Sequence, residues 1–299
     1  MNRIIKDKFV NIVADMTSMT GIYLPDDVEK KLRELAAEET KPEAVTMYEC
    51  MIRDIEMAAE LGRPLCQDTG ALQFFADVGT GFPYMDAIES VIHEAAIKAT
   101  REIPLRPNVV EPLGEYNTGN NEGYGAPYIQ YRLDPGSSDL RLRLYMAGGG
   151  SSLPGRSKVL MPLEGIEGIK RFVYETVVEW GTNACPPLQL GIGLGTCAET
   201  SALLSKMALL RPLGTHSSFP KVAKLEEEIQ RELDSIGIAP LGFGGSHTVM
   251  GVNIEAAGHH PATIGVGITT GCWATRRGEI VIHDDLSYDV ISHKRVFEG

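Results

Sequence analysis

The sequence has no long apolar run and no excess of basic residues. No segment approaches the roughly 20 consecutive apolar residues that a membrane-spanning helix needs. The start, MNRIIKDKFVNIV, mixes charges with aliphatic residues and does not build the core of a signal peptide. Lys and Arg total 28 against 40 for Asp and Glu, a net charge of -12, so nucleic-acid phosphates have no basic footprint to bind. We therefore expect a cytoplasmic protein with neither a membrane nor a nucleic acid as partner.

Cysteines are also few, and they do not cluster. Five of them, odd in number, do not suit a disulfide framework in an oxidising compartment, and their long gaps lack the C-x-x-C spacing of zinc ribbons or ferredoxins. The five are Cys50, Cys66, Cys185, Cys197 and Cys272. Spacing alone leaves two interpretations open, packed thiols and metal ligands.

Glycine, by contrast, is abundant, whereas aromatic residues are scarce. The chain has 32 glycines in 299 residues and only 7% aromatic residues. Because glycine lets the backbone turn tightly or approach a ligand closely, this composition predicts a ligand site built partly from main chain. At 43% hydrophobic residues, the chain can build one large core or two modest ones.

Hydrophobic periodicity predicts an α+β fold. Apolar residues recur at helical spacing from Asn2 to about Leu61, with a helix start at Pro25 and a stop at Gly62, so residues 1–62 form a helical N-terminal region. Further helices are expected over 85–100, 166–180, 199–211 and 222–236, and strands over 72–78, 249–256, 263–269 and 279–283. Residues 128–133 and 140–146 flank the turn DPGSSD and predict a hairpin. Residues 1–299 should form a single domain, with two lobes as the alternative.

Three of the cysteines lie where a thiolate can be presented. Cys66 in RPLCQDTG, Cys185 in TNACPPL and Cys272 in ITTGCWA each fall at the end of an element beside glycine, proline or a small residue. Cys50, within a helical pattern, and Cys197, in GLGTCAETSALL, have the usual surroundings of small buried side chains. We therefore expect these last two to be structural.

The segment MAGGGSSLPGRSK begins at the end of the strand expected over 140–146 and contains three consecutive glycines, Gly148 to Gly150. Backbone N–H groups without a shielding Cβ can cradle an oxyanion, and Arg156 and Lys158 would add positive charge. A flexible surface loop is the alternative. The spacing matches neither a phosphate loop nor G-x-G-x-x-G, so nucleotide binding is not indicated.

Arg106 and a pair of histidines are further candidates. Arg106, between a leucine and a proline in LRPNVVEP, suits recognition of a carboxylate, with a structural ion pair as the alternative. His259 and His260 precede Cys272 by about one strand length, and one of them is a candidate to face the same pocket. An ordinary hydrogen-bonded surface histidine is the alternative.

Together these segments resemble the class I (iron–sulfur) fumarase/tartrate dehydratase family. The motifs occur in the expected order over nearly the whole chain: CQDTG, LRPNVV, NTGNN, AGGGSSLPGRSKVLMP, NACPP, RPLG and TTGCWATRRG. The form PGRSKVLMP is closer to the alpha subunit of the tartrate dehydratases than to the fumarases. The fold implied is that of the N-terminal-type, alpha-subunit domain of this family.

The resemblance implies a [4Fe–4S] cluster and a set of roles. Cys66, Cys185 and Cys272 would bind three irons, which leaves the fourth iron as a Lewis acid for a substrate hydroxyl. Asp68 and His260 would be catalytic, with His259 as the alternative to His260. The substrate would be bound by Gln67, Arg106 and the backbone at Gly149.

The resemblance also implies a partner and a reaction. Long members of the family continue beyond a point equivalent to Gly299 into a second region that supplies the base, so a beta subunit is expected here, in an α2β2 assembly. The expected activity is dehydration of L(+)-tartrate to oxaloacetate, absent from this chain alone. Hydration of fumarate to L-malate is the alternative, and a metal-free anion-binding module is the rival from another class.

Overall fold

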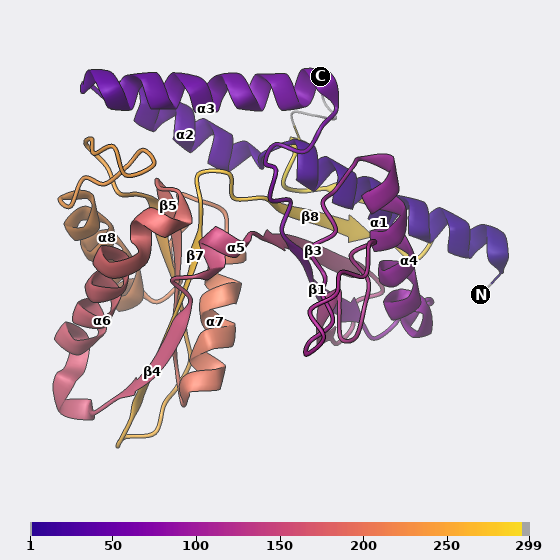
Figure 1. Cartoon of the computed structure of the whole chain (residues 1–299). Coiled ribbons are helices and arrows are strands. Elements are labelled where there is room, and N and C mark those ends of the chain that lie inside the picture. The colour runs from indigo at the N-terminus through magenta and orange to yellow at the C-terminus, as the bar shows by residue number, and fades with distance from the viewer. Residues whose placement is uncertain (1, 295–299) are drawn as a thin grey trace. The chain divides into compact units, whose positions relative to one another are not determined.

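The computed structural model describes residues 2–294 and divides into two compact units. The first unit comprises residues up to 26 together with 54–148 and the segment from 276 onward, and the second comprises 27–53 and 149–275. The chain begins with three helices, α1 (Arg3–Ile22), α2 (Asp26–Glu38) and α3 (Pro42–Leu61), which confirms the predicted helical start (Figure 1). Within the described part of the chain, no helix combines the length and the apolarity that crossing a membrane requires.

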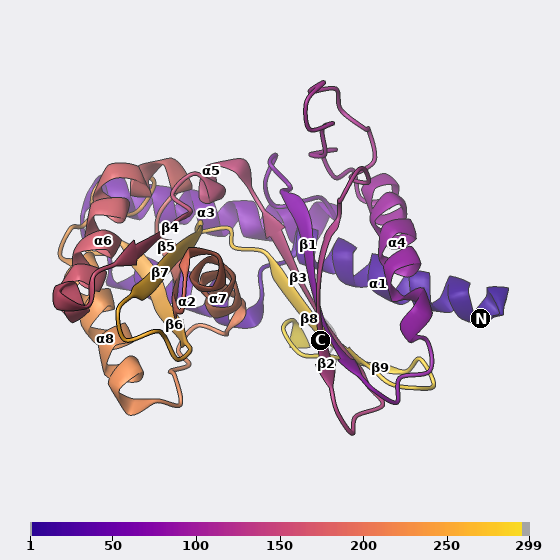
Figure 2. The same ribbon diagram turned by 90° about the horizontal axis from the view of Figure 1, so that it is seen from below.

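The first unit is a five-stranded sheet with helices on one face. Its strand order is β2 (Tyr128–Asp134), β1 (Ala71–Gly79), β3 (Leu140–Ala147), β8 (Arg277–Ile282) and β9 (Tyr288–Val290). Because strand side chains alternate between faces, Phe74 and Leu142 point toward Phe9 of α1 and Val91 of α4 (Ile88–Glu102), and all four are completely buried. A single 3-10 turn, Met85–Ala87, leads into α4. Figure 2 shows α1 and α4 beside this sheet.

The predicted hairpin between residues 128–133 and 140–146 is wrong. Both strands exist, but β1 lies between them, parallel to β2 and antiparallel to β3. The segment β1–α4–β2 is a parallel crossover, which places β2 on one edge of β1 and leaves the other edge for β3. Asp77 of β1 also accepts hydrogen bonds from Arg132 of β2 and Arg143 of β3, so side chains as well as backbone join the three strands.

The second unit is a four-stranded sheet with helices on both faces. The order is β4 (Arg156–Leu160), β7 (Ile264–Gly271), β5 (Leu188–Gly195) and β6 (Val249–Ala256). Aliphatic residues of α6 (Gly165–Trp180) and α8 (Pro220–Asp234) share a core with one face of this sheet. Helix α7 (Ala198–Leu210) lies on the other face. The unit also contains most of α2, the first part of α3, the short helix α5 (Gly149–Ser152) and 3-10 turns over Pro162–Glu164 and Gly181–Ala184.

Strand β5 alternates aliphatic residues with glycine, and each kind has its own face. Leu190 and Ile192 lie in the core with α6 and α8, whereas Gly191 and Gly193 face α7. A Cβ added at Gly193 would overlap the carbonyl oxygen of Ser201, so the bare glycine face lets the backbone of α7 approach the sheet. The sequence pattern did not predict β5, because glycine lowers strand propensity.

Candidate active site

In the first unit, two predicted substrate-binding residues lie in direct contact. Gln67 belongs to the segment between α3 and β1, and Arg106 follows α4. The Nη1 atom of Arg106 donates a hydrogen bond to Oε1 of Gln67 at 2.8 Å, and both side chains are exposed. The guanidinium is therefore oriented by a protein partner while solvent, or a ligand, can still reach it.

The neighbouring Asp68 is fixed from both sides. Its Oδ1 accepts the N–H of Gly70 at 3.1 Å, and its carbonyl oxygen accepts Nη2 of Arg276 at 2.7 Å. Gly70 has a φ of +83°, and a Cβ there would lie 2.7 Å from the carbonyl carbon of Met146, so only glycine fits. Arg276, which is 2% exposed, lies in the TTGCWATRRG motif, yet the sequence reading gave it no role.

In the second unit, three predicted motifs meet. The glycine segment is not a flexible loop, since Gly149–Ser152 form the helical turn α5 directly after β3. A Cβ at Gly150 would lie 2.9 Å from the carbonyl oxygen of Asn183, and Thr270 donates its hydroxyl to the carbonyl of Ser151. The backbone of Gly149 is exposed beside these contacts.

Cys185 and Cys272 come together at this same place. The carbonyl oxygen of Cys185 accepts the N–H of Trp273, the residue after Cys272, at 3.0 Å. Cys185 ends the 3-10 turn with a φ of +53°, a left-handed conformation that a non-glycine residue seldom adopts outside a constrained site. Cys272 directly follows β7, and its carbonyl accepts the hydroxyl of Thr275 at 2.7 Å.

The chemistry of these donors fits an iron–sulfur cluster. All five cysteines are thiols and not disulfides, and thiolates are the usual ligands of such clusters. Cys185 is exposed, and Cys66 and Cys272 are half-buried, so none of the three side chains is enclosed in a core. Cys66 belongs to the first unit and the other two to the second, and no group of three His, Cys, Asp or Glu residues suited to a metal occurs among residues 2–294.

The expectation that Cys50 is buried is wrong. Its side chain is exposed on α3, where the buried residues Ala44, Tyr48, Met51 and Ile55 recur at spacings of three and four. Cys50 lies beside that stripe and not on it. Cys197 is half-buried at the N-cap of α7.

His260 lies away from the two cysteines of its own unit. It belongs to the exposed segment between β6 and β7, where its carbonyl accepts the N–H of Thr263 at 3.0 Å. Strand β7, eight residues long, separates this segment from Cys272, a distance of about 26 Å at ~3.3 Å per residue. His259 is in the same position, so within one copy of the chain neither histidine shares a pocket with Cys272.

Arg156 and Lys158 lie on the edge strand β4. The Nη1 atom of Arg156 is 3.3 Å from a carboxylate oxygen of Glu179, and its guanidinium carbon lies 5.5 Å from the centre of the Trp180 ring. Lys158 is exposed. The guanidinium of Arg156 therefore already interacts with two residues at the end of α6.

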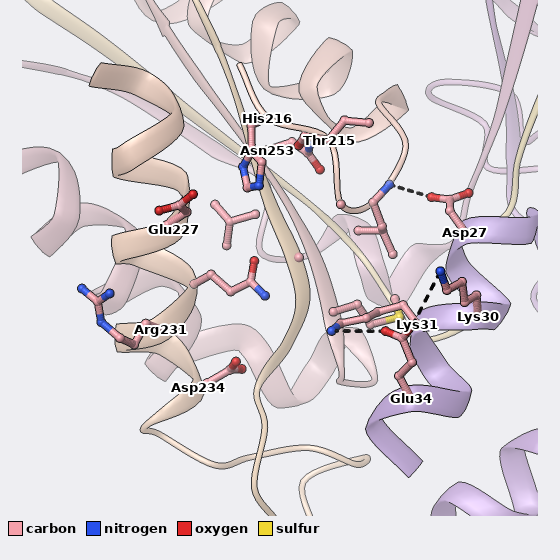
Figure 3. A pocket seen from close by; sticks show the side chains of 16 residues that line it. Asp27, Lys30, Lys31, Glu34, Thr215, His216, Glu227, Arg231, Asp234 and Asn253 are labelled. Carbon is pink, nitrogen blue, oxygen red and sulfur yellow. Dashed lines mark hydrogen bonds and ion pairs between the residues drawn. The ribbon is translucent and has the colours of Figure 1, made fainter. Parts of the chain in front are cut away.

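A separate pocket of about 660 Å³ lies elsewhere in the second unit (Figure 3). Helices α2 and α8 form its sides, β6 forms its floor, and the segment 213–216 closes one end. Its charged lining is mixed in sign on both helices, since α2 contributes Lys30, Lys31 and Glu34 and α8 contributes Glu227, Arg231 and Asp234. None of the site residues predicted from the sequence lines it, so this pocket is separate from the candidate active site.

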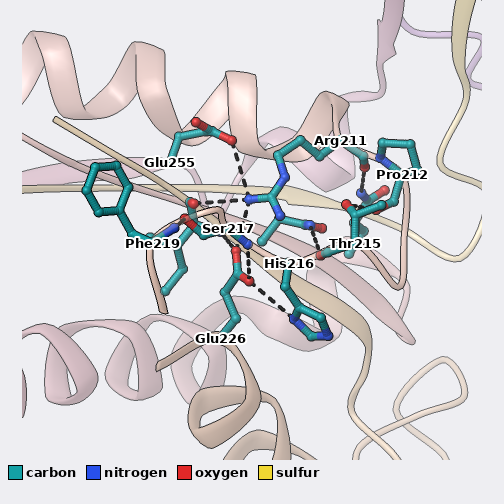
Figure 4. Close-up of polar contacts among 11 residues, drawn as sticks. Arg211, Pro212, Thr215, His216, Ser217, Phe219, Glu226 and Glu255 are labelled. Atoms are coloured by element: carbon teal, nitrogen blue, oxygen red, sulfur yellow. Dashed lines mark hydrogen bonds and ion pairs between the residues drawn. The ribbon is translucent and has the colours of Figure 1, made fainter. Parts of the chain in front are cut away.

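One end of that pocket is held by the buried carboxylate of Glu226 (Figure 4). Glu226 is 1% exposed and accepts Nη1 of Arg211 at 2.9 Å, the N–H of Ile254 at 2.7 Å and the N–H of Ser217 at 3.0 Å. These bonds tie α8 to β6 and to the RPLG segment. The RPLG motif therefore has a structural role in this unit.

Comparison with known proteins shows similarity to one family over most of the chain. The model of the family described as fumarate hydratase (Fumerase) matches residues 10–281. The L(+)-tartrate dehydratase subunit alpha of Escherichia coli K12 is 45% identical over 97% of this chain and 95% of its own length. The protein of the same name from Shigella boydii has the same identity and coverage. A relative from Methanocaldococcus jannaschii is 37% identical over 90% of this chain and 96% of its own length.

Proposed function

Because the chain belongs to the fumarate hydratase (Fumerase) family, we propose that it is the alpha subunit of a hydro-lyase that dehydrates L(+)-tartrate to oxaloacetate. The observation that carries the proposal is the near full-length similarity to relatives named as alpha subunits of that enzyme. The contact between Gln67 and Arg106 supports it, since it prepares a guanidinium for a carboxylate.

The residues of the first unit bind and orient the substrate. Arg106 pairs with one carboxylate of the hydroxy acid, and Gln67 keeps its guanidinium in place. Asp68, held by Gly70 and Arg276, contacts the substrate hydroxyl and exchanges a proton with it. In the second unit, the exposed backbone at Gly149 contacts the dicarboxylate.

Cys66, Cys185 and Cys272 hold a [4Fe–4S] cluster in this proposal. When bound, the cluster supplies a Lewis-acidic iron that makes the departing hydroxide a better leaving group. The support is the similarity to the family together with three exposed or half-buried thiols. Cys185 and Cys272 lie at the ends of elements, whereas Cys66 lies within the segment between α3 and β1 and not, as the sequence had predicted, at the end of an element. An oxygen-sensitive cluster and an odd number of free cysteines both fit a reducing compartment, so we place the protein in the cytoplasm.

The partner is a beta subunit, in an α2β2 assembly. The names of the relatives as alpha subunits support a second polypeptide, which would supply the base that removes the proton from the neighbouring carbon. His260 lies at the far end of β7 from Cys272. In this proposal His260 therefore does not act with the cysteines of its own chain. It acts in the active site that contains the cysteines of a second copy of the chain.

The second candidate is the alpha subunit of a two-subunit fumarate hydratase. The description of the matching family favours it, and the same residues would serve both reactions. The two substrates differ by one hydroxyl, which a pocket discriminates only where it is built to pair with that hydroxyl. Kinetic preference therefore decides between the two reactions.

The test is activity of the reconstituted assembly. The chain is co-expressed with the companion subunit, loaded with iron and sulfide under anaerobic conditions, and assayed for oxaloacetate from L-tartrate and malate from fumarate. We expect the larger kcat/KM with tartrate. A preference for fumarate supports the second candidate, and a colourless protein without activity on either substrate supports a metal-free binding module.

Serine variants test the cluster ligands. Cys66→Ser, Cys185→Ser and Cys272→Ser should each lose bound iron, visible absorbance and activity. The matched controls, Cys50→Ser and Cys197→Ser, should retain all three. A fully active Cys185→Ser enzyme would contradict the ligand assignment.

A mixing experiment tests the source of His260. Cys185→Ser and His260→Ala chains are each inactive in this proposal, but random co-assembly should recover about a quarter of the wild-type sites, because one site of each mixed pair receives both intact residues. If cysteine and histidine of one site came from the same copy, mixing would recover nothing.

A further inference from the structure

The side chain of Asn121 is the buried centre of the segment that carries Arg106. Asn121 belongs to the NTGNN motif, for which the proposed function has no role, and is 1% exposed. Its Oδ1 accepts the N–H of Asn108 at 2.7 Å, and its Nδ2 donates to the carbonyl oxygen of Arg106 and to the hydroxyl of Thr100, each at 3.1 Å. One amide therefore joins the end of α4 to the backbone on both sides of Pro107.

A second set of bonds joins this segment to CQDTG. The hydroxyl of Thr69 donates to the same Arg106 carbonyl at 3.2 Å, and Nδ2 of Asn108 donates to that hydroxyl at 3.3 Å. Arg106 is thus held at both ends, its carbonyl by Asn121 and Thr69 and its guanidinium by Gln67 at 2.8 Å.

The backbone conformation at Asn121 limits which residue types this position can hold. Its φ is +61°, in the left-handed region that asparagine, aspartate and glycine tolerate best. Glycine would keep the conformation and lose every side-chain bond. Aspartate would keep the shape and the acceptor for Asn108 but could not donate to Arg106 or Thr100.

We propose that Asn121 is a positioning residue that holds the backbone of Arg106 so that its guanidinium is pre-oriented for a substrate carboxylate. The inference rests on the proposed role of Arg106. Arg106 lies between the end of α4 at Glu102 and the start of β2 at Tyr128, outside both elements, so no helix or strand holds it. An arginine that is already ordered loses less freedom when it binds a carboxylate, so Asn121 contributes to affinity.

The first test separates KM from kcat in the assembled enzyme, with whichever hydroxy acid the wild type converts. Asn121→Gly and Asn121→Asp should raise KM about tenfold or more and change kcat by less than about threefold, because Arg106 binds ground state and transition state alike. The matched control is Asn120→Ala in the same motif, and its KM should stay at the wild-type value. The Asn120 side chain accepts the N–H of Glu122 and makes no other hydrogen bond within residues 2–294. An unchanged KM in both Asn121 variants overturns the proposal.

A double-mutant cycle tests whether Asn121 acts through Arg106. In an Arg106→Ala background, Asn121→Asp should add no further rise in KM, since the side chain it positions is gone. A residue that only stabilises the fold would show the same effect in both backgrounds. Equal effects on KM with and without Arg106 therefore overturn the proposal.

Hydrogen exchange gives a readout that does not depend on turnover. The N–H of Asn108 is bonded to Asn121, so Asn121→Gly should speed exchange at residues 105–109, whereas Asn120→Ala should not. If the wild-type assembly converts neither tartrate nor fumarate, the proposed function is contradicted, but the proposed positioning of Arg106 by Asn121 is not. Unchanged exchange at residues 105–109 in Asn121→Gly would contradict the positioning role of Asn121 and leave the proposed function untouched.

Discussion

The two units hold their parts of the candidate site by different means. In the first unit, side chains hold Arg106, whose two ends are bound by Gln67, Thr69 and Asn121, and close backbone packing is confined to Gly70 beside Asp68. In the second unit, backbone packs on backbone: Gly150 lies against the Asn183 carbonyl, and the N–H of Trp273 bonds to the carbonyl of Cys185. A site held by side chains loses affinity gradually on substitution, whereas one held by close backbone loses its shape when a single methyl is added.

The cores of the two units differ in the same way. In the first unit, α1 and α4 pack through full side chains such as Phe9, Val91 and Phe74. In the second unit, α7 lies on the glycine face of β5 and β7, where Gly193 and Gly267 both face Ser201. Interiors are close-packed, so the second unit has no space for a larger residue at these positions.

The largest effect should follow from Gly193→Ala. The added Cβ would overlap the Ser201 carbonyl, a backbone group that cannot move alone, so we expect the second unit to lose more than about 3 kcal/mol of stability or to fail to fold. Thermal unfolding and hydrogen exchange in α7 and β5 measure this. Gly258→Ala is the matched control, since within residues 2–294 its added Cβ would have no atom within 4 Å beyond those of its chain neighbours, and it should unfold like the wild type. A Gly193→Ala protein of wild-type stability would remove the contrast between the units.

Asp77→Ala should have the next largest effect, in the first unit. Asp77 is 6% exposed, and its carboxylate accepts Nη2 of Arg143 at 2.6 Å and Nη2 of Arg132 at 2.9 Å. Its loss leaves Arg143 largely buried without this partner, so we expect a loss of about 2–3 kcal/mol in the free energy of unfolding. Chemical denaturation measures it, with exposed Asp284→Ala as the control. Equal stabilities of the two variants would show that charge does not hold β2 and β3 to β1.

Periodicity predicted the helices well and the sheets less well. The expected helix 222–236 is α8 within two residues, because its amphipathic pattern is strong, and the expected strand 249–256 matches β6. Strand β5 was missed because its Leu–Gly alternation reads as turn and loop. The false hairpin arose because sequence proximity favours pairing of adjacent strands, whereas here the crossover through α4 decided the order of the sheet.

The site shows the same division. Cys185 and Cys272 were predicted at the ends of elements from flanking glycine and proline, which act locally. Asn121 and Arg276 had no such signal, because their hydrogen-bond partners, such as the carbonyl oxygens of Arg106 and Asp68, are distant in sequence and are brought near only by the fold. Cys50 was assigned to the core from its helix, but the phase of that helix turns it to solvent.

A pH-dependent effect should distinguish the second unit. Burial disfavours the ammonium of Lys206 on α7 and lowers its pKa from 10.5 to about 8. Between pH 8 and 10.5 the unfolded chain therefore binds more protons than the folded one, and stability of the second unit should rise with pH. Lys206→Met should remove that rise and add about 1–2 kcal/mol at pH 7. Exchange in α7 as a function of pH measures it, and Lys224→Met on exposed α8 surface should keep the wild-type profile.

The smallest effect should come from His283 in the first unit, with the opposite sign. Hydrogen bonds to Asp139 at 3.0 Å and to Asp289 at 3.2 Å raise the pKa of His283 above 6.5. Its contribution to stability is complete below the unfolded pKa of 6.5 and is lost as pH rises through the higher folded value. His283→Gln should therefore increase exchange in β8 and β9 at pH 6 and leave it unchanged at pH 9, whereas α7 should not respond at either pH. If β8 and β9 became less protected equally at both pH values, packing and not the charge of His283 would join them, and the first unit would lack the pH response that sets it against the second.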